Sequence, residues 1–271
     1  RQQGEWVGYT YAWNDEQTDA ELVESEGRDV EIPIRSGDQI NHKKWHIPSR
    51  AECMVCHSRA ANFVLGVSTA QLNRDHDYGG VVDNQLRTFE SLGLFKHDAR
   101  KDVESHFKQM LSDAGKTEDE ADADLKQVKA TRNQRPAPAS CQLLAKPPAA
   151  HDKLADPYDE KADLEARARS YLHVNCASCH TNAGGGNAQI NLVYHRKLPG
   201  LEAIGKPPLH DKYELPEAQI IHPSHPERSV LLHRMRVRGR GQMPPLATHN
   251  VDEQAVKLID AWIRKLEPLP E

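Results

Sequence analysis

Aromatic side chains are scarce in this sequence: only 6% of the 271 residues are Phe, Trp or Tyr, and four of them are Phe. Apolar residues of all kinds make up 38%, which is thin for a self-sufficient core of this length. There is no run of about 18 or more apolar residues, so no membrane-spanning helix is expected. A strong excess of charge is also lacking: the formal net charge of −5 argues against a nucleic-acid-binding surface.

The beginning of the chain lacks the features of a secretory signal peptide, and its first residue is Arg1. We therefore expect a processed chain or a fragment of a longer protein. The opening stretch EWVGYTYAWND alternates aromatic with small residues, as a strand or hairpin does. We interpret it as the end of a larger β-rich unit that precedes this chain.

Cysteine is also rare, but four of the five cysteines fall into two copies of one motif, Cys-x-x-Cys-His. A Cys-x-x-Cys pair occurs in structural zinc sites, in dithiol redox sites and in covalent haem attachment. Only haem attachment needs a histidine directly after the second cysteine, because that histidine binds the iron while the two thiols form thioethers. The number of CxxCH motifs expected by chance in a chain of this composition is far below one. The two Cys-x-x-Cys pairs also lie too far apart in the sequence for a zinc ribbon.

We therefore predict two covalently bound haem c groups, and the zinc and dithiol interpretations stay as alternatives. Each haem would be attached by one motif, either Cys53, Cys56 and His57 or Cys176, Cys179 and His180. Haem is a large apolar body, so two of them would supply interior that the side chains lack.

Met243 is the candidate for the sixth ligand of the second iron. It stands in the stretch GRGQMPPLAT, where two prolines follow it and stiffen the loop. A methionine thioether favours ferrous iron and raises the potential, which suits electron transfer. The segment DEQAVKLIDAWIRKL after it predicts an amphipathic helix capped by Asp252, with Trp262 beside an apolar face. We expect this face to pack on the helix that carries Tyr171 and Leu172.

The sixth ligand of the first iron is left open by the sequence. Met110 is the first choice, and His97, His106 and His76 are alternatives, with His46 a smaller candidate. A second histidine would give that haem the lower potential.

Several other polar residues have roles that the sequence does not decide. The fifth cysteine, Cys141, is a free thiol, a partner for a cysteine outside this chain, or a thiolate ligand to a haem. TNAGGGN is interpreted as a turn that lets backbone pass near a haem edge. Two further groups are either surface residues or partners for haem propionates: the histidines His222, His225 and His233, and the arginines Arg234, Arg236, Arg238 and Arg240.

Residues 164–271 resemble a class I cytochrome c domain in their order of helix, CxxCH, long loop, Met-Pro and final helix. Together with WHIPSRAECMVCH, NQLRTFESLGLF and HPERSVLLHRM, most of the chain resembles the exported dihaem cytochrome c proteins of bacteria, notably of planctomycete type. That resemblance implies haem and electron transfer, and redox protein partners such as a fused or neighbouring dehydrogenase. It implies no substrate, and it departs at about 100–150, where this chain has a charged insertion.

The expected fold is mainly α, with two cytochrome c-like helical haem domains and a small β-rich N-terminal segment. The expected segments are a β-rich 1–45, a first haem domain 46–110, a charged insertion and Pro/Ala-rich linker 111–163, and a second haem domain 164–271. The predicted function is electron relay between periplasmic or otherwise exported redox partners. The alternatives are a dihaem enzyme, either a peroxidase or a sulfur-compound dehydrogenase, and a binding module in which haem is structural.

Overall fold

The computed structural model describes residues 6–92, 94, 111–112, 115–117, 119–120, 122–124, 126 and 148–269. The chain divides into two compact units. Unit 1 comprises Arg1–Leu65, Tyr171–Leu192 and Glu202–Glu271, and unit 2 comprises Gly66–Ser170 and Val193–Leu201. Both CxxCH motifs therefore belong to unit 1.

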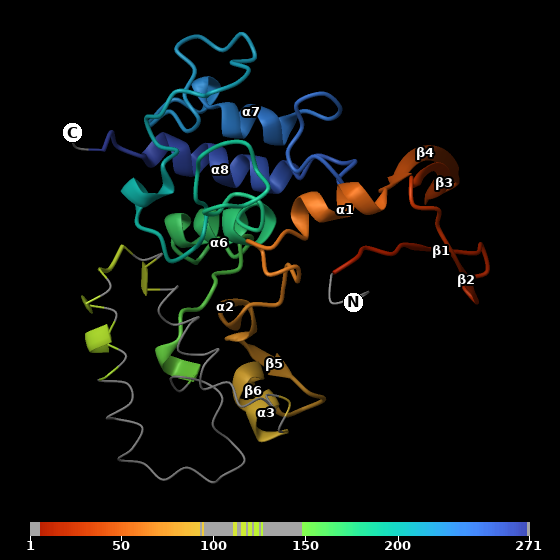
Figure 1. Cartoon of the computed structure of the whole chain (residues 1–271), viewed down its shortest axis with the longest axis horizontal. Coiled ribbons are helices and arrows are strands. Elements are labelled where there is room, and N and C mark those ends of the chain that lie inside the picture. The colour runs from red at the N-terminus through yellow and green to blue at the C-terminus, as the bar shows by residue number, and fades with distance from the viewer. Residues whose placement is uncertain are drawn as a thin grey trace. The chain divides into compact units, whose positions relative to one another are not determined.

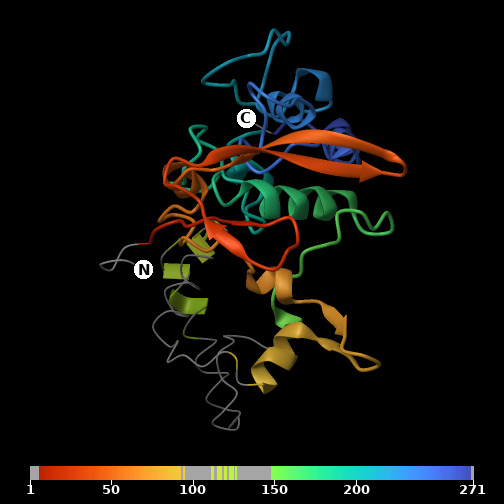
Figure 2. The same ribbon diagram turned by 90° about the vertical axis from the view of Figure 1, so that its right-hand side faces the viewer.

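The first part of unit 1 is built from two antiparallel strand pairs. They are β1 (Tyr11–Trp13) with β2 (Ala20–Leu22), and β3 (Arg28–Ser36) with β4 (Gln39–Ile47). The second pair is the long hairpin of Figure 2, and a glycine with a φ of +61° at position 37 makes its turn. The strand predicted in EWVGYTYAWND is β1, which covers only Tyr11–Trp13 of that stretch.

Helix α1 (Arg50–Cys56) follows the hairpin and carries the first motif. Its start is fixed by a capping box, in which the Ser49 hydroxyl accepts from the Glu52 backbone N–H and the Glu52 carboxylate accepts from the Ser49 N–H. The helix ends at Cys56, and His57 is its C-cap residue. Local sequence signals thus place both cysteines of the motif on one short helix.

The C-terminal part of unit 1 is helical. Helix α6 (Leu164–Cys176) enters unit 1 at Tyr171 and runs into the second motif, and η3 (Pro226–Arg228), α7 (Val230–Arg236) and α8 (Glu253–Lys265) pack together. The Asp252 carboxylate accepts from the Ala255 N–H at 3.0 Å, which confirms the predicted cap. Trp262 and the apolar face around it are buried, and α8 lies beside α6 in both views (Figures 1 and 2).

Unit 2 contains short elements and the N-terminal part of α6. The elements are α2 (Thr69–Leu72), β5 (Asp75–Asp77), β6 (Val82–Asn84), α3 (Gln85–Ser91), η1 (Pro148–Ala150) and η2 (Leu198–Leu201). The buried Asn73 amide donates to the carbonyl oxygens of Pro148 and His151, each at 2.9 Å, and so ties α2 to η1. Across the described ranges no helix combines the length and the apolar character needed to cross a bilayer.

Candidate haem site

The first motif presents its histidine in a defined orientation. The His57 ring lies with Nδ1 2.6 Å from the carbonyl oxygen of Phe63. A carbonyl oxygen can only accept, so Nδ1 carries the hydrogen and Nε2 is left with a free lone pair. A hydrogen bond of this kind from the second ring nitrogen is what orients metal-binding histidines in proteins.

The N-terminal segment covers this motif, which the sequence did not indicate. A methyl group in place of a Gly8 hydrogen would lie 2.9 Å from Cβ of Cys53 and 3.3 Å from its Sγ. Trp6 stacks on Phe63 with ring centroids 5.6 Å apart. The N-terminal segment therefore contacts the first cysteine through Gly8 and, through Trp6, the residue whose carbonyl oxygen accepts from His57.

The second motif begins at the end of α6 and continues in a tight turn. The His180 N–H donates to the carbonyl oxygen of Cys176 at 2.9 Å. Burial raises the pKa of the Cys176 thiol to about 12, and burial, followed by a contact with Cys179, raises that of Cys56 to about 11. Burial thus disfavours the thiolate at Cys176 and Cys56, which is the form that a catalytic dithiol uses.

His180 lies in a low-dielectric position. Burial, followed by the charge of Arg234, lowers the pKa of its imidazole and favours the neutral form that binds metals. Its Nδ1 is buried and has no hydrogen-bond partner among the described residues. Unlike His57, this ring shows no orienting hydrogen bond from Nδ1 to a described residue, so its fit to a metal-containing group rests on its neutral form and on the two cysteines beside it.

TNAGGGN contains a turn, as predicted, and its glycines pack closely against both motifs. A methyl group added at Gly184 would lie 2.2 Å from the carbonyl oxygen of Cys179, and one added at Gly186 would lie 2.7 Å from Nδ1 of His180. At Gly185 it would lie 2.2 Å from the carbonyl oxygen of Val55, a residue of the first motif. Only residues without a side chain fit these three positions.

Met243 lies half-buried in a loop tied to the helix before it. Its N–H donates to the carbonyl oxygen of Arg234 at 2.9 Å. The Gln242 side-chain amide donates to the carbonyl oxygens of Pro244 at 3.0 Å and Thr248 at 3.1 Å, which closes the loop on itself. Since the Arg234 side chain also lies close enough to His180 to affect its pKa, one residue links the Met243 loop to the second motif.

Two other arginines of this stretch, Arg236 and Arg238, bond to protein groups. Arg236 pairs with Asp260 of α8 at 2.7 Å. The Arg238 guanidinium donates to the carbonyl oxygens of Met235 at 3.0 Å and Asn250 at 2.5 Å. These contacts brace the two ends of the Met243 loop.

The same loop rests on the β3–β4 hairpin. Trp45 and His249 lie with ring centroids 4.5 Å apart, and the Lys43 ammonium donates to the side-chain oxygen of Asn250. Ile32 and Ile34 line an apolar groove of about 350 Å³ beside these contacts. The hairpin therefore supports the segment that presents the candidate sixth ligand.

Of the candidates for the sixth ligand of the first iron, the structure describes only His46 and His76. Both ring nitrogens of His46 are engaged, Nδ1 by Asp29 at 2.7 Å and Nε2 by Glu52 at 3.1 Å, so neither is left for iron. His76 is exposed on β5 and packs edge-on against Tyr78. Three other candidates, Met110, His97 and His106, lie outside the described residues, and so does Cys141.

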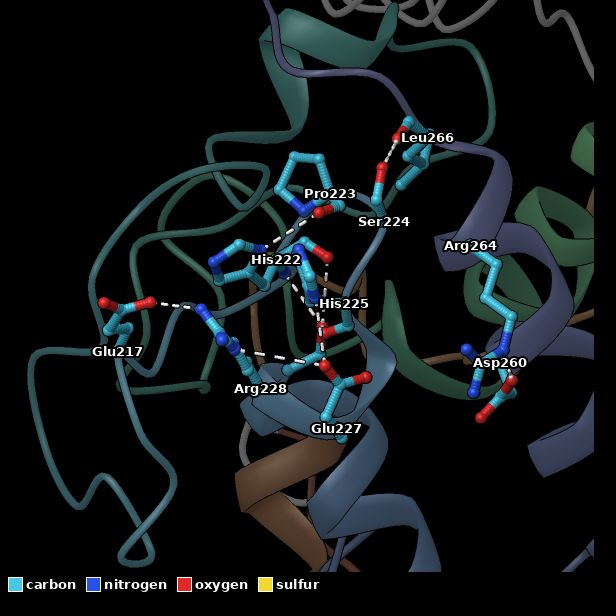
Figure 3. Close-up of polar contacts among 11 residues, drawn as sticks. Glu217, His222, Pro223, Ser224, His225, Glu227, Arg228, Asp260, Arg264 and Leu266 are labelled. Carbon is cyan, nitrogen blue, oxygen red and sulfur yellow. Dashed lines mark hydrogen bonds and ion pairs between the residues drawn. The ribbon is translucent and has the colours of Figure 1, made fainter.

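Three histidines of the C-terminal part of unit 1 have local partners, and Figure 3 shows two of them, His222 and His225. The His222 ring lies with Nδ1 3.0 Å from the carbonyl oxygen of Pro223, and His225 pairs with Glu227 at 3.0 Å. His233 stacks on Tyr213 with centroids 4.8 Å apart. In the part of the chain that the structure describes, no three His, Cys, Asp or Glu side chains form a cluster that could hold a metal ion.

Residues 162–263 match a family model described as cytochrome c oxidase, cbb3-type, subunit III. The match covers less than half of the chain. It shows that the C-terminal half contains a cytochrome c domain, the kind of domain that carries covalently bound haem c and transfers electrons. The chain matches no curated protein and no solved structure.

Proposed function

We propose that the protein is a dihaem c-type cytochrome that relays electrons between redox partners outside the cytoplasm. The observation that carries the proposal is the recurrence in this one chain of a complete CxxCH motif, once inside the matched cytochrome c domain and once on α1. The matched domain supports one haem. The free Nε2 of His57 supports the second, because that ring is already oriented for a metal.

Each residue has a distinct part in this account. Cys53 and Cys56 of the first motif, and Cys176 and Cys179 of the second, form thioether bonds to the haem vinyl groups. His57 and His180 would each hold one of the two haem irons. When bound, each haem supplies an iron that takes up and releases one electron.

The sixth ligands complete the account. Met243 binds the second iron, and its braced loop keeps the sulfur in place when the oxidation state changes, so little structure must reorganise. Met110 remains the proposed ligand of the first iron. The predicted arrangement of two helical haem domains belongs to this proposal as well.

Location and partners follow from the same chemistry. Thioether attachment takes place outside the cytoplasm, so we expect the protein in the periplasm or otherwise exported. Its partners are redox proteins, including a dehydrogenase that is fused to it or encoded nearby.

Carbon monoxide binding to the reduced protein tests the relay. A relay with both irons six-coordinate binds little CO, because no position on the iron is open. Ready binding of one CO per chain would instead indicate the dihaem enzyme, with one open haem. The spectrum of the reduced protein before and after CO addition reports the result.

A further inference from the structure

The two haem-attachment motifs lie against each other within unit 1. Gly185, which follows the second motif, approaches the carbonyl oxygen of Val55 so closely that a methyl group there would be 2.2 Å from it. The Cys179 thiol lies 3.9 Å from the same oxygen. Val55 is the residue directly before Cys56, so the contact joins one motif to the other.

The two inner cysteines are also neighbours. The side chains of Cys56 and Cys179, the second cysteine of each motif, are in hydrogen-bonding contact. Their sulfurs stand in for the thioether sulfurs of the loaded protein. A thioether sulfur is one carbon away from the haem ring, so neighbouring sulfurs bring the edges of two rings together.

We propose that the contact between Val55 and Gly185 holds the two haems as a directly coupled pair. One electron leaves the ferrous iron of one haem and enters the ferric iron of the other, without passing through an external carrier. Because the charges are close and partly buried, oxidation of one iron makes oxidation of the other harder. Gly185 is in this account a positioning residue, since it touches the other attachment segment and not the iron. The inference rests on the proposed presence of two haems.

Electron paramagnetic resonance (EPR) of the fully oxidised full-length protein tests the coupling. The reference spectra come from two one-haem variants, Cys53→Ala/Cys56→Ala and Cys176→Ala/Cys179→Ala. If the irons are coupled, the wild-type spectrum is broader than the sum of the two references, and the extra broadening disappears when one haem is reduced. Haem content is measured first on each sample with the pyridine haemochrome assay.

Gly185→Ala probes the contact itself. The added methyl group must push the two motifs apart, so the extra broadening should decrease while two haems stay attached. Gly200→Ala is the matched control, because its methyl group would meet only the flexible Arg196 side chain at 3.4 Å. It should leave the spectrum unchanged.

The outcomes separate the inference from the proposed function. A wild-type protein with two haems and a spectrum equal to the sum of the references overturns the coupling and leaves the relay intact. A wild-type protein with one haem overturns the proposed function. If Gly185→Ala fails to assemble, the comparison of the wild type with the one-haem variants still decides the question.

Discussion

The imidazole of His57 donates from Nδ1 to the carbonyl oxygen of Phe63 across 2.6 Å, so Nε2 is the free nitrogen of the ring. This one bond leaves Nε2 as the nitrogen available to the proposed haem iron, on a segment that the family match does not cover. The sequence spacing predicts the order of the proposed ligands, whereas the hydrogen bond predicts which nitrogen would face the proposed iron.

Replacing Met243 with alanine should alter the second haem alone. Loss of the sulfur should remove the weak long-wavelength absorption band of the oxidised protein that arises from sulfur-to-iron charge transfer. The potential of that haem should fall by on the order of 100 mV, because a soft ligand that favours ferrous iron is lost and water enters. The haem should stay attached, since neither thioether involves this residue. Optical redox titration measures both effects.

Met235→Leu is the control for this substitution. Met235 is buried in α7, where a leucine of similar volume is tolerated. It should keep both the band and the potential. A Met243→Ala protein that also keeps them would show that Met243 only packs in its loop, and that another residue is the ligand.

Part of the architecture could be predicted from the sequence, and part could not. Local patterns predicted the helix that ends at Cys176 and the helix capped by Asp252, because periodicity and capping residues act within a few positions. The contact of Gly185 with Val55 joins segments far apart in the chain, and no local pattern specifies such a pairing. For the same reason the close approach of Gly184 and Gly186 to the second motif, and that of Gly8 to the first, were not predicted.

The Glu52 carboxylate should make stability depend on pH in the acid range. Hydrogen bonds from the Ser49 backbone N–H and then from His46 lower its pKa from 4.5 to about 2. Because the folded pKa lies below the unfolded one, the contribution is present above about pH 4.5 and is lost as pH falls toward 2. The side chain is 40% exposed, so solvent screening keeps the effect below about 1 kcal/mol.

Glu52→Gln should flatten the pH dependence of the unfolding midpoint between about pH 4.5 and 2. Glu16→Gln, in the exposed turn between β1 and β2, should leave it unchanged. The contribution of His46 to stability depends on pH in the opposite direction. Asp29 and then Glu52 raise the pKa of its imidazole, so this stabilisation is lost as pH rises, outside the range from about 4.5 to 2. If the unfolding midpoint of Glu52→Gln depends on pH as steeply as that of the wild type, the charge of this carboxylate does not contribute to the stability of the capping box.

Asp252→Ala should destabilise the C-terminal helix. The substitution removes the carboxylate that accepts from the Ala255 N–H, a loss that costs about 1 kcal/mol for a typical N-cap. Asp252→Ser retains a capping oxygen and should behave like the wild type. Thermal unfolding of the three proteins measures the difference, and equal midpoints for alanine and aspartate would exclude a stabilising cap.

Counting haems per chain tests the central claim most directly. The pyridine haemochrome assay on denatured protein should return two haems c for the wild type, and acid acetone should extract neither. It should return one each for Cys53→Ala/Cys56→Ala and Cys176→Ala/Cys179→Ala, because each motif holds its own haem. A wild-type value of one, unchanged when Cys53 and Cys56 are replaced, would contradict the account.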